Sequence, residues 1–387
     1  PGQIDSPPAL VDRNGGRPPR MNQWNISLQR ELGKDLVVEA AYVGNRGVWE
    51  QANGLVNLNA LTPERIAQFG LNINNPGDLN LLTSKLNSPA AQAAGFKAPY
   101  AGYSLNNTVA QSLRPFPQFG TLNEMWAPLG NTWYDALQIK VTKRFSHGVE
   151  FTANYTSSKN LATAEEQSGT TVPINNVFNR RVQKTYSLND QPNIFVMSFN
   201  YRTPGWNRSS WTRHILGGWE LGGILRYASG TPIQIPTANN SLGSALFQNT
   251  FAVRVPGQPL FLKDLNCGCI DPNKDLVLNP NAWTQPAAGQ FGTSAAYYND
   301  YRYARRPDEE LSLGRVFRIK ESLNFQIRAE LFNVFNRTYL NNPVATNAQA
   351  STGHSANGNL SSGFGYINPS SVFASPRTGQ IVARFQF

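Results

Sequence analysis

The strongest constraint on the fold is a rhythm in which two amphipathic segments are joined by a shorter link and followed by a far longer polar stretch. This pattern occurs four times along the 387 residues. In the clearest pair, apolar and polar side chains alternate over 133–145 and again over 149–155, with a polar turn at 146–148. Side chains on a strand point to opposite faces with a period of two. The pattern therefore predicts a sheet with one apolar and one polar face.

Further segments have the same construction and are expected to form strands. They are 24–28 with 36–42, 195–201 with 219–227, 311–319 with 323–331, and a last strand, 381–387, that ends the chain. Polar turns predict hairpins for the first and third of these pairs, whereas the link 204–217 is longer. Nine strands are expected in all. The segment 119–126 is a possible further strand, but it would break the strict alternation of short and long links and is left out of the count.

The long stretches are rich in Asn, Ser, Gly and Pro. They cover residues 44–131, 158–192, 229–308 and 333–376. Connections of this length are uncommon in compact domains and usually serve function. In outer-membrane barrels, short turns face the periplasm and long loops face outward. The sequence therefore predicts an all-β, antiparallel transmembrane β-barrel portion over residues 21–387 with long extracellular loops, and a loop or linker remnant over residues 1–20.

Composition agrees with a barrel surface. Only 15% of the residues are charged, against about a quarter in typical soluble domains. No run of eighteen apolar residues exists, which excludes a spanning helix, but a barrel strand needs only about ten alternating residues. Residues 1–20 lack the apolar core of a signal peptide. The chain is thus expected to be either processed or part of a longer protein.

Strand parity leads to the same expectation. The carboxyl terminus of a bacterial barrel lies in the periplasm, so the last strand and the first of nine both run inward. Bacterial single-chain barrels have an even number of strands. An odd number is therefore expected upstream, unless one strand lies within residues 1–21, where the prolines argue against it.

The formal charge of +10 raises the question of a polyanionic partner. The cations are dispersed, with no run denser than 302–306, so a nucleic acid is not expected. Several cations share the polar face of their strands and are candidate lumen-facing ligand contacts: Lys140, Arg144, Arg226, Arg318, Lys320, Arg328 and Arg384. The alternative is cross-strand pairing with Glu39, Glu150, Glu220 and Glu330. Loop arginines could equally contact the phosphates of lipopolysaccharide.

Neither a metal or cofactor site nor an enzyme is expected. Cys267 and Cys269 lie one residue apart in a long stretch and are either a disulfide or two free thiols, because no further metal ligands are placed nearby. The three histidines, His147, His214 and His354, adjoin no pattern of nucleophiles or metal ligands. Glu165-Glu166 could suggest a glycosidase, but adjacent carboxylates rarely point at one bond.

An ordered set of motifs resembles the TonB-dependent receptors of the Oar-like branch. The motifs are QWNISLQREL (23–32), VEAAYVGNRG (38–47), RPFPQFG (114–120), YDALQ (134–138), KRFSHG (143–148), YTSSK (155–159), LGGWEL (216–221), SGTP (229–232) and RAELFNVFN (328–336). The resemblance covers most of the chain beyond residue 20. It implies a barrel of 22 strands around a plug, with a carboxypeptidase-regulatory-like domain ahead of it. Neither the plug nor that domain is visible in the sequence. If the barrel has 22 strands, 13 of them would precede the nine expected here.

The resemblance also implies a location and partners. The location is the outer membrane of a Gram-negative bacterium, and the partners are outer-membrane lipid and lipopolysaccharide, the barrel-assembly machinery, and the TonB complex acting through the upstream plug. Phe387 matches the assembly signal of many outer-membrane proteins, and the simpler interpretation is an interfacial aromatic residue at a strand end.

Three functions remain open. The first is a receptor barrel for uptake of an unknown substrate, the second a structural or adhesive surface protein without transport, and the third a secreted soluble β-sandwich that binds a ligand. The third requires the apolar faces to meet in a dry centre. The residues that would lie there are Leu137, Phe151, Phe199, Leu221, Phe325 and Phe385.

Overall fold

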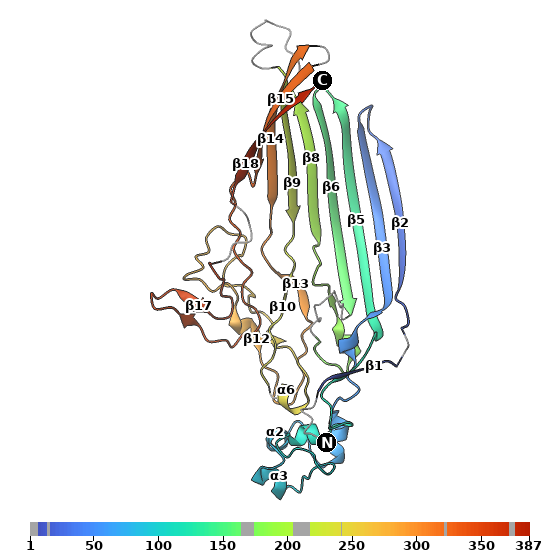
Figure 1. Cartoon of the computed structure of the whole chain (residues 1–387), viewed down its shortest axis with the longest axis vertical. Helices are drawn as coiled ribbons and strands as arrows, with labels where there is room; N and C mark the ends of the chain where they lie inside the picture. Colours follow the sequence, from blue (N-terminus) through green and yellow to red (C-terminus); the bar gives the residue numbers. More distant parts are fainter. Residues whose placement is uncertain are drawn as a thin grey trace.

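Nine long strands form one antiparallel sheet in which strands adjacent in the sheet follow one another along the chain (Figure 1). The computed structural model describes residues 7–13, 16–163, 174–203, 217–240, 242–320, 323–370 and 376–387. The strands are β2 (Arg20–Glu31), β3 (Leu36–Gln51), β5 (Pro128–Ser146), β6 (Val149–Thr163), β8 (Asn193–Arg202), β9 (Trp219–Ala228), β14 (Asp308–Lys320), β15 (Leu323–Phe332) and β18 (Thr378–Gln386). All nine expected strands are present, and the described sheet is open, with β2 and β18 at its edges.

Links at the two ends of the sheet differ in length. The turn between β5 and β6 places His147 and Gly148 at φ of 54° and 83°, as the type I′ turns favoured in tight hairpins require. At the other end, long loops join β3 to β5, β6 to β8, β9 to β14 and β15 to β18; they are called the first to fourth loops below. The residues 204–216 and 321–322, which fall in two of the expected short links, lie outside the described residues.

The apolar face of the sheet is exposed. The exposed fractions of Ile26, Leu28 and Ile381 are 71%, 77% and 76%. Leu137, Leu221 and Phe385 are exposed too, and the other three residues expected in a dry centre are only half-buried. The prediction that these apolar faces do not meet in a packed protein interior is confirmed.

The hydrophobic core lies in the loops. Among the described residues, the only buried apolar side chains from the nine strands are Ala136, Ala162 and Ala228. One buried cluster joins the third and fourth loops, including Ile233, Tyr301 and Ile367. A second joins the first loop to Leu242, Ala245 and Leu246 of the third. The loops therefore pack on one another as a folded unit at one end of the sheet (Figure 1).

Short helices occur in the loops, where none was expected. They are α1 (Pro63–Gln68), α2 (Pro76–Thr83), α3 (Pro89–Ala93), α4 (Val109–Ser112) and α6 (Leu242–Ala245), with 3₁₀ turns η1 (Asn53–Leu55), η2 (Arg180–Gln183) and η3 (Pro280–Ala282). Thr62, Asn75 and Ser88 cap the first three helices, each followed by a proline. These cap-and-proline pairs are start signals readable from the sequence. No helix among the described residues has the length and apolar character needed to cross a membrane.

Small strands also lie outside the nine. β1 (Ala9–Val11) pairs in parallel with β4 (Leu122–Glu124). A short strand thus lies within residues 1–21, where the prolines argue against one, but neither β1 nor β4 joins the large sheet. β4 falls within the segment 119–126. The other small strands are β7 (Lys184–Tyr186), which extends the large sheet beside β6, and β10 (Pro232–Gln234), β11 (Val253–Arg254), β12 (Trp283–Thr284), β13 (Tyr297–Arg302), β16 (Gly353–His354) and β17 (Leu360–Ser362).

The long strands extend further toward the loops than the hydropathy pattern indicates. β3 continues to Gln51, β5 begins at Pro128 and β6 reaches Thr163, inside the stretches 44–131 and 158–192. Backbone pairing holds these ends together, where the side chains no longer alternate between apolar and polar.

We predict that Gly148→Ala destabilises the sheet more than Gly33→Ala does. Both glycines have positive φ, but an added Cβ at Gly33 meets nothing within 4 Å, whereas at Gly148 it lies 2.3 Å from the Arg202 carbonyl oxygen. Left-handed backbone alone costs an alanine roughly 1 kcal/mol, and overpacking adds about 1–3 kcal/mol. Urea unfolding followed by tryptophan fluorescence measures both variants. Equal losses would show that the hairpin relaxes around the added methyl group.

Candidate functional site

Four cavities at the base of the loops share one wall, the segment 302–307 between β13 and β14. Their volumes are about 570, 570, 150 and 300 Å³. The first borders the fourth loop and the second borders residues 261–266 of the third loop. The third borders the end of β9, and the fourth borders the ends of both β9 and β14. This segment, which carries Arg302, Arg305 and Arg306, is where the cavities and the positive charge of the loops coincide.

A close backbone contact fixes the start of the segment. Tyr303 donates its amide to the Thr231 carbonyl at 2.9 Å. A Cβ added at Gly230 would lie 1.8 Å from the Tyr303 carbonyl oxygen. Only glycine allows the chain leaving β9 to approach the segment this closely, which gives a physical role to the glycine of the SGTP motif.

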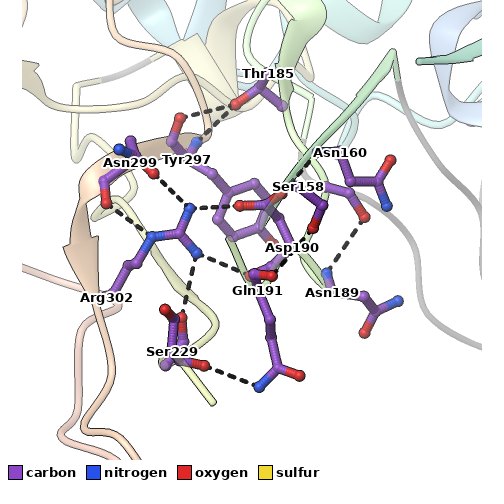
Figure 2. Close-up of polar contacts among 12 residues, drawn as sticks. Ser158, Asn160, Thr185, Asn189, Asp190, Gln191, Ser229, Tyr297, Asn299 and Arg302 are labelled. Carbon is purple, nitrogen blue, oxygen red and sulfur yellow. Dashed lines mark hydrogen bonds and ion pairs between the residues drawn. The ribbon is translucent and has the colours of Figure 1, made fainter. Parts of the chain in front are cut away.

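Arg302 anchors the third loop to the second through a buried ion pair, shown in Figure 2. Its guanidinium lies 2.5 Å from the Asp190 carboxylate, and the two side chains are 12% and 0% exposed. It also donates to the carbonyls of Asp190, Gly230 and Asn299 at 2.8, 3.2 and 2.8 Å. The other Asp190 oxygen accepts the Asn160 amide of β6 at 2.7 Å. One arginine thus connects the second and third loops to the end of the sheet.

Neighbouring polar groups complete this junction (Figure 2). The Thr185 hydroxyl donates to the Tyr297 carbonyl at 2.9 Å and accepts the amide of the same residue at 3.0 Å. The Gln191 side chain donates to the Ser229 carbonyl at 2.9 Å. These bonds hold the cavity walls in place without involving Arg305.

The first cavity is lined by three arginines and by no carboxylate. Arg305 donates to the Asn266 side chain at 3.3 Å and Arg306 to that of Asn342 at 3.0 Å, both neutral partners. The third, Arg337, forks onto Glu309, with a closest contact of 2.9 Å to a carboxylate that is 1% exposed. The Glu309 contact raises the Arg337 pKa. Arg305 is therefore the cation best placed to meet an anionic group in this cavity.

Tyr339 lies between this cavity and the one at the start of β14, and lines both. Its hydroxyl is buried and has no hydrogen-bond partner among the described residues. Burial raises its pKa, so the hydroxyl keeps its proton. An unpartnered buried hydroxyl is costly, and a polar ligand in the cavity would satisfy it.

The predicted lumen-facing cations do not come together. Arg226 reaches two of the cavities, while Lys140 and Arg384 lie exposed on their strands. Arg144 pairs with Glu31 at 3.6 Å and Arg328 with Glu330 at 2.5 Å. The side chains of Arg318 and Lys320 lie outside what the structure describes.

The four glutamates predicted to pair across strands have different kinds of contact in the structure. Glu220 pairs with Arg202 at 2.5 Å, and Glu330 pairs within its own strand. Glu150 accepts the Asn200 amide at 3.2 Å. Glu39 lies opposite Lys140.

Cys267 and Cys269 form a disulfide in the third loop, and Cys267 lines the first cavity. His147 lies in the hairpin turn and His354 on β16, whereas His214 and Glu165-Glu166 fall outside the described residues. No three His, Cys, Asp or Glu side chains gather as a metal site in the described part of the chain. The first cavity, with Arg305 and Tyr339 in its wall, suits reversible binding of a polar, anionic solute.

Sequence reasoning missed Arg305, Arg306 and Tyr339 as a group. In the sequence, the run 302–306 stands out only as the densest cluster of cations, and its relation to Tyr339 depends on how the third and fourth loops pack. Nothing local marks Tyr339.

The comparisons with known proteins concern the fold. A family model described as "Outer membrane beta barrel domain" matches residues 4–380. No curated protein matches the chain. Similar solved structures include the outer membrane transporter YddB from Escherichia coli, with a TM-score of 0.39 and 10% identity over 98% of this chain and 34% of that chain.

Two further solved structures are similar at the same level. BauA, the ferric preacinetobactin receptor from Acinetobacter baumannii, gives a TM-score of 0.38 and 9% identity over 94% of this chain and 29% of that chain. The pyoverdine outer membrane receptor FpvA from Pseudomonas aeruginosa PAO1 gives 0.38 and 11%, with 97% and 31% covered. The chain spans about a third of the length of these structures.

We predict that Arg302→Met loosens the loop assembly far more than Arg254→Met. The first leaves a fully buried carboxylate without its partner, which costs about 3–5 kcal/mol. The second breaks a pair whose Asp300 is 57% exposed, worth at most about 1 kcal/mol. Limited proteolysis in urea, with cleavage in the second and third loops mapped by mass spectrometry, measures the difference. Similar cleavage midpoints for the two variants would contradict the anchoring role of Arg302.

Proposed function

The chain belongs to the outer membrane beta barrel domain family, and from this premise we propose that it is the carboxyl-terminal barrel part of a TonB-dependent receptor of the Oar-like branch. Its location is the outer membrane of a Gram-negative bacterium. In the proposed function, the long loops capture a ligand outside the cell and the complete receptor moves it through the barrel. The proposal includes no catalytic step.

One observation carries this proposal: the loops are a folded unit with their own core and cavities, positioned at one end of the open sheet. Loops that served only to connect strands would not need buried clusters or a buried ion pair. In barrels of this class, the long loops lie on the extracellular side. The cavities would then lie where an incoming ligand first meets the protein.

The proposed barrel is larger than the described sheet. Twenty-two strands, the number in outer-membrane transporters with a plugged lumen, would leave 13 beyond the nine seen here. These strands would pair with the edges at β2 and β18, because an open edge has no place in hydrocarbon. The plug, and contact with the TonB complex through it, would belong to the rest of the receptor.

The proposed ligand carries anionic groups. Arg305 and Arg306 line a cavity of about 570 Å³ without a lining carboxylate, and arginine recognises carboxylate and phosphate by paired hydrogen bonds. Arg226, at the end of β9, would receive the ligand next. The predicted lumen-facing cations Lys140, Arg144, Arg328 and Arg384 would continue the path along the polar face.

The other proposed partners follow from the membrane location. Phe387, fully exposed at the end of the chain, would be the signal for the barrel-assembly machinery. Outer-membrane lipid and lipopolysaccharide would surround the apolar face.

A structural or adhesive surface protein is the second candidate. The observation that favours it is the same loop core, because a rigid loop unit also suits attachment. The soluble β-sandwich is not proposed, because its dry centre is missing.

We predict energised uptake by the complete gene product. Cells that carry it should remove from the medium at least one anionic solute that cells lacking the gene leave behind, and loss of the TonB complex should abolish the removal. Mass spectrometry of spent medium measures this. Removal that persists without the TonB complex would contradict the mechanism, and lost surface attachment with no solute removed would favour the adhesive candidate.

We predict that Arg305→Gln combined with Tyr339→Phe slows this uptake by at least about a hundredfold. Each change removes a hydrogen bond to a charged ligand, worth about 1.5–3 kcal/mol for such bonds. The matched control, Lys274→Gln with Tyr100→Phe, changes the same kinds of group at exposed loop positions and should leave the rate unchanged. Equal rates for the two double variants, at equal surface abundance, would remove the cavity from the ligand path.

A further inference from the structure

The apolar face of β2, β3, β5, β6 and β7 ends, toward the loops, in a band of cations and aromatic rings. Residues paired directly across a ladder point to the same face, so the register defines rows across the sheet. The row nearest the apolar residues is Trp24, Gly44, Asp135 and Lys159; the next is Asn22, Arg46, Trp133, Leu161 and Tyr186; the third is Arg20, Val48, Asn131, Thr163 and Lys184. We call these three rows the cationic belt.

The belt continues the apolar face without a break. The next row toward the hairpin turns is Ile26, Tyr42, Leu137 and Ser157, and the one after it Leu28, Ala40, Ile139 and Tyr155. Ile26, Leu28 and Leu137 are exposed, as residues that contact hydrocarbon should be. The belt therefore lies at the boundary between the lipid-facing rows and the loops.

Each cation of the belt lies over an aromatic ring. Lys184 is 4.0 Å from the Trp133 ring centroid, Arg46 5.3 Å from Trp24 and Lys159 5.5 Å from Tyr186. Arg20 lies 4.7 Å from Trp49, whose ring also holds Arg17 at 3.3 Å. Such contacts hold a cation in place and leave its charge available.

The belt has more positive than negative charge. The carboxylate of Asp135, in the first row, forms an ion pair with Arg46 at 2.9 Å and accepts a hydrogen bond from the Tyr42 hydroxyl at 2.6 Å. Arg20, Lys159 and Lys184 are exposed and form no ion pair with a described carboxylate. The bulge at Trp49 turns Glu50 toward Gly47 and Thr132 on the polar face, so Glu50 does not neutralise it.

We propose that the cationic belt is a binding site for the phosphate groups of lipopolysaccharide in the outer leaflet. Aromatic residues mark the membrane interface, and cations next to it attract anionic headgroups. A soluble anion would meet this charge equally well in the loops, whereas cations on the lipid-facing side of the strands point to a ligand whose acyl chains cover the rows below. The inference depends on the outer-membrane location and on outward-facing long loops, not on transport, so failure of uptake would leave it standing.

The test compares two triple variants of the complete gene product in detergent. Arg20→Gln, Lys159→Gln and Lys184→Gln remove three cations from the belt. Arg30→Gln, Lys143→Gln and Arg315→Gln remove three from the same face near the hairpin turns, with the same change in net charge. Heat-modifiable migration confirms that both variants fold. Binding is measured with purified lipopolysaccharide, with enzymatically dephosphorylated lipopolysaccharide, and with inorganic phosphate as competitor.

We expect the belt variant to bind lipopolysaccharide at least tenfold more weakly than the unaltered protein, and the control variant to stay within about twofold. Dephosphorylated lipopolysaccharide should bind the unaltered protein no better than the intact lipid binds the belt variant. Inorganic phosphate at millimolar concentration should not displace the lipid. Equal losses in both triple variants, tight binding of the dephosphorylated lipid, or displacement by free phosphate would each overturn the site.

Discussion

The sheet depends on hydrocarbon on one side, because it has no packed interior of its own. Exposed Ile26, Leu28 and Ile381 would be unfavourable against water, at about 25 cal/mol for each Å² of apolar surface. Hydrocarbon removes that cost but imposes another, since an unpaired backbone amide or carbonyl in lipid costs several kcal/mol. The nearly unbroken ladders from β2 to β18 meet the second condition. The hairpin turns and loops can break the ladder because they lie at its ends.

A sheet whose only buried apolar side chains, among the described residues, are three alanines contributes little burial to the loops, so the loops provide their own core. Buried asparagines supply much of the polar order. Asn59 donates to the carbonyls of Phe116, Phe119 and Gly120 at 2.8–2.9 Å. Asn175 donates to those of Gly292 and Ser294 at 2.8 and 2.9 Å and accepts from the Thr250 hydroxyl at 2.7 Å. In long chains with little regular structure, such side chains take the place of ladder bonds.

The difference between a sheet formed by local alternation and a loop core formed by distant contacts explains which features the sequence could reveal. The nine strands follow from a local property, the period of two, and the hairpin at 146–148 from local turn chemistry. The ends of β3 and β5 were missed because backbone pairing continues beyond the apolar rows. The short helices had local signals in Thr62-Pro63 and Ser88-Pro89. The clustering of Arg305 with Tyr339 had none, because it depends on contacts between loops that are far apart in the chain. The composition rich in Asn correctly indicated irregular structure but concealed a buried core.

The kind of group that each arginine contacts depends on where the fold places that arginine. Arg302, in a nearly dry junction, is matched by a buried carboxylate, since an unpaired charge there would be prohibitive. Arg202, on the polar face, shares Glu220 with a neighbouring amide, a modest interaction in contact with water. Arg20, at the end of the apolar face, lies against an indole ring and forms no ion pair with a described carboxylate. At that boundary a permanent carboxylate partner would cancel the attraction to an anionic headgroup, whereas a ring preserves it. Whether an arginine is neutralised by a carboxylate thus depends on its position along the strands. The net charge of +10 does not reveal this difference.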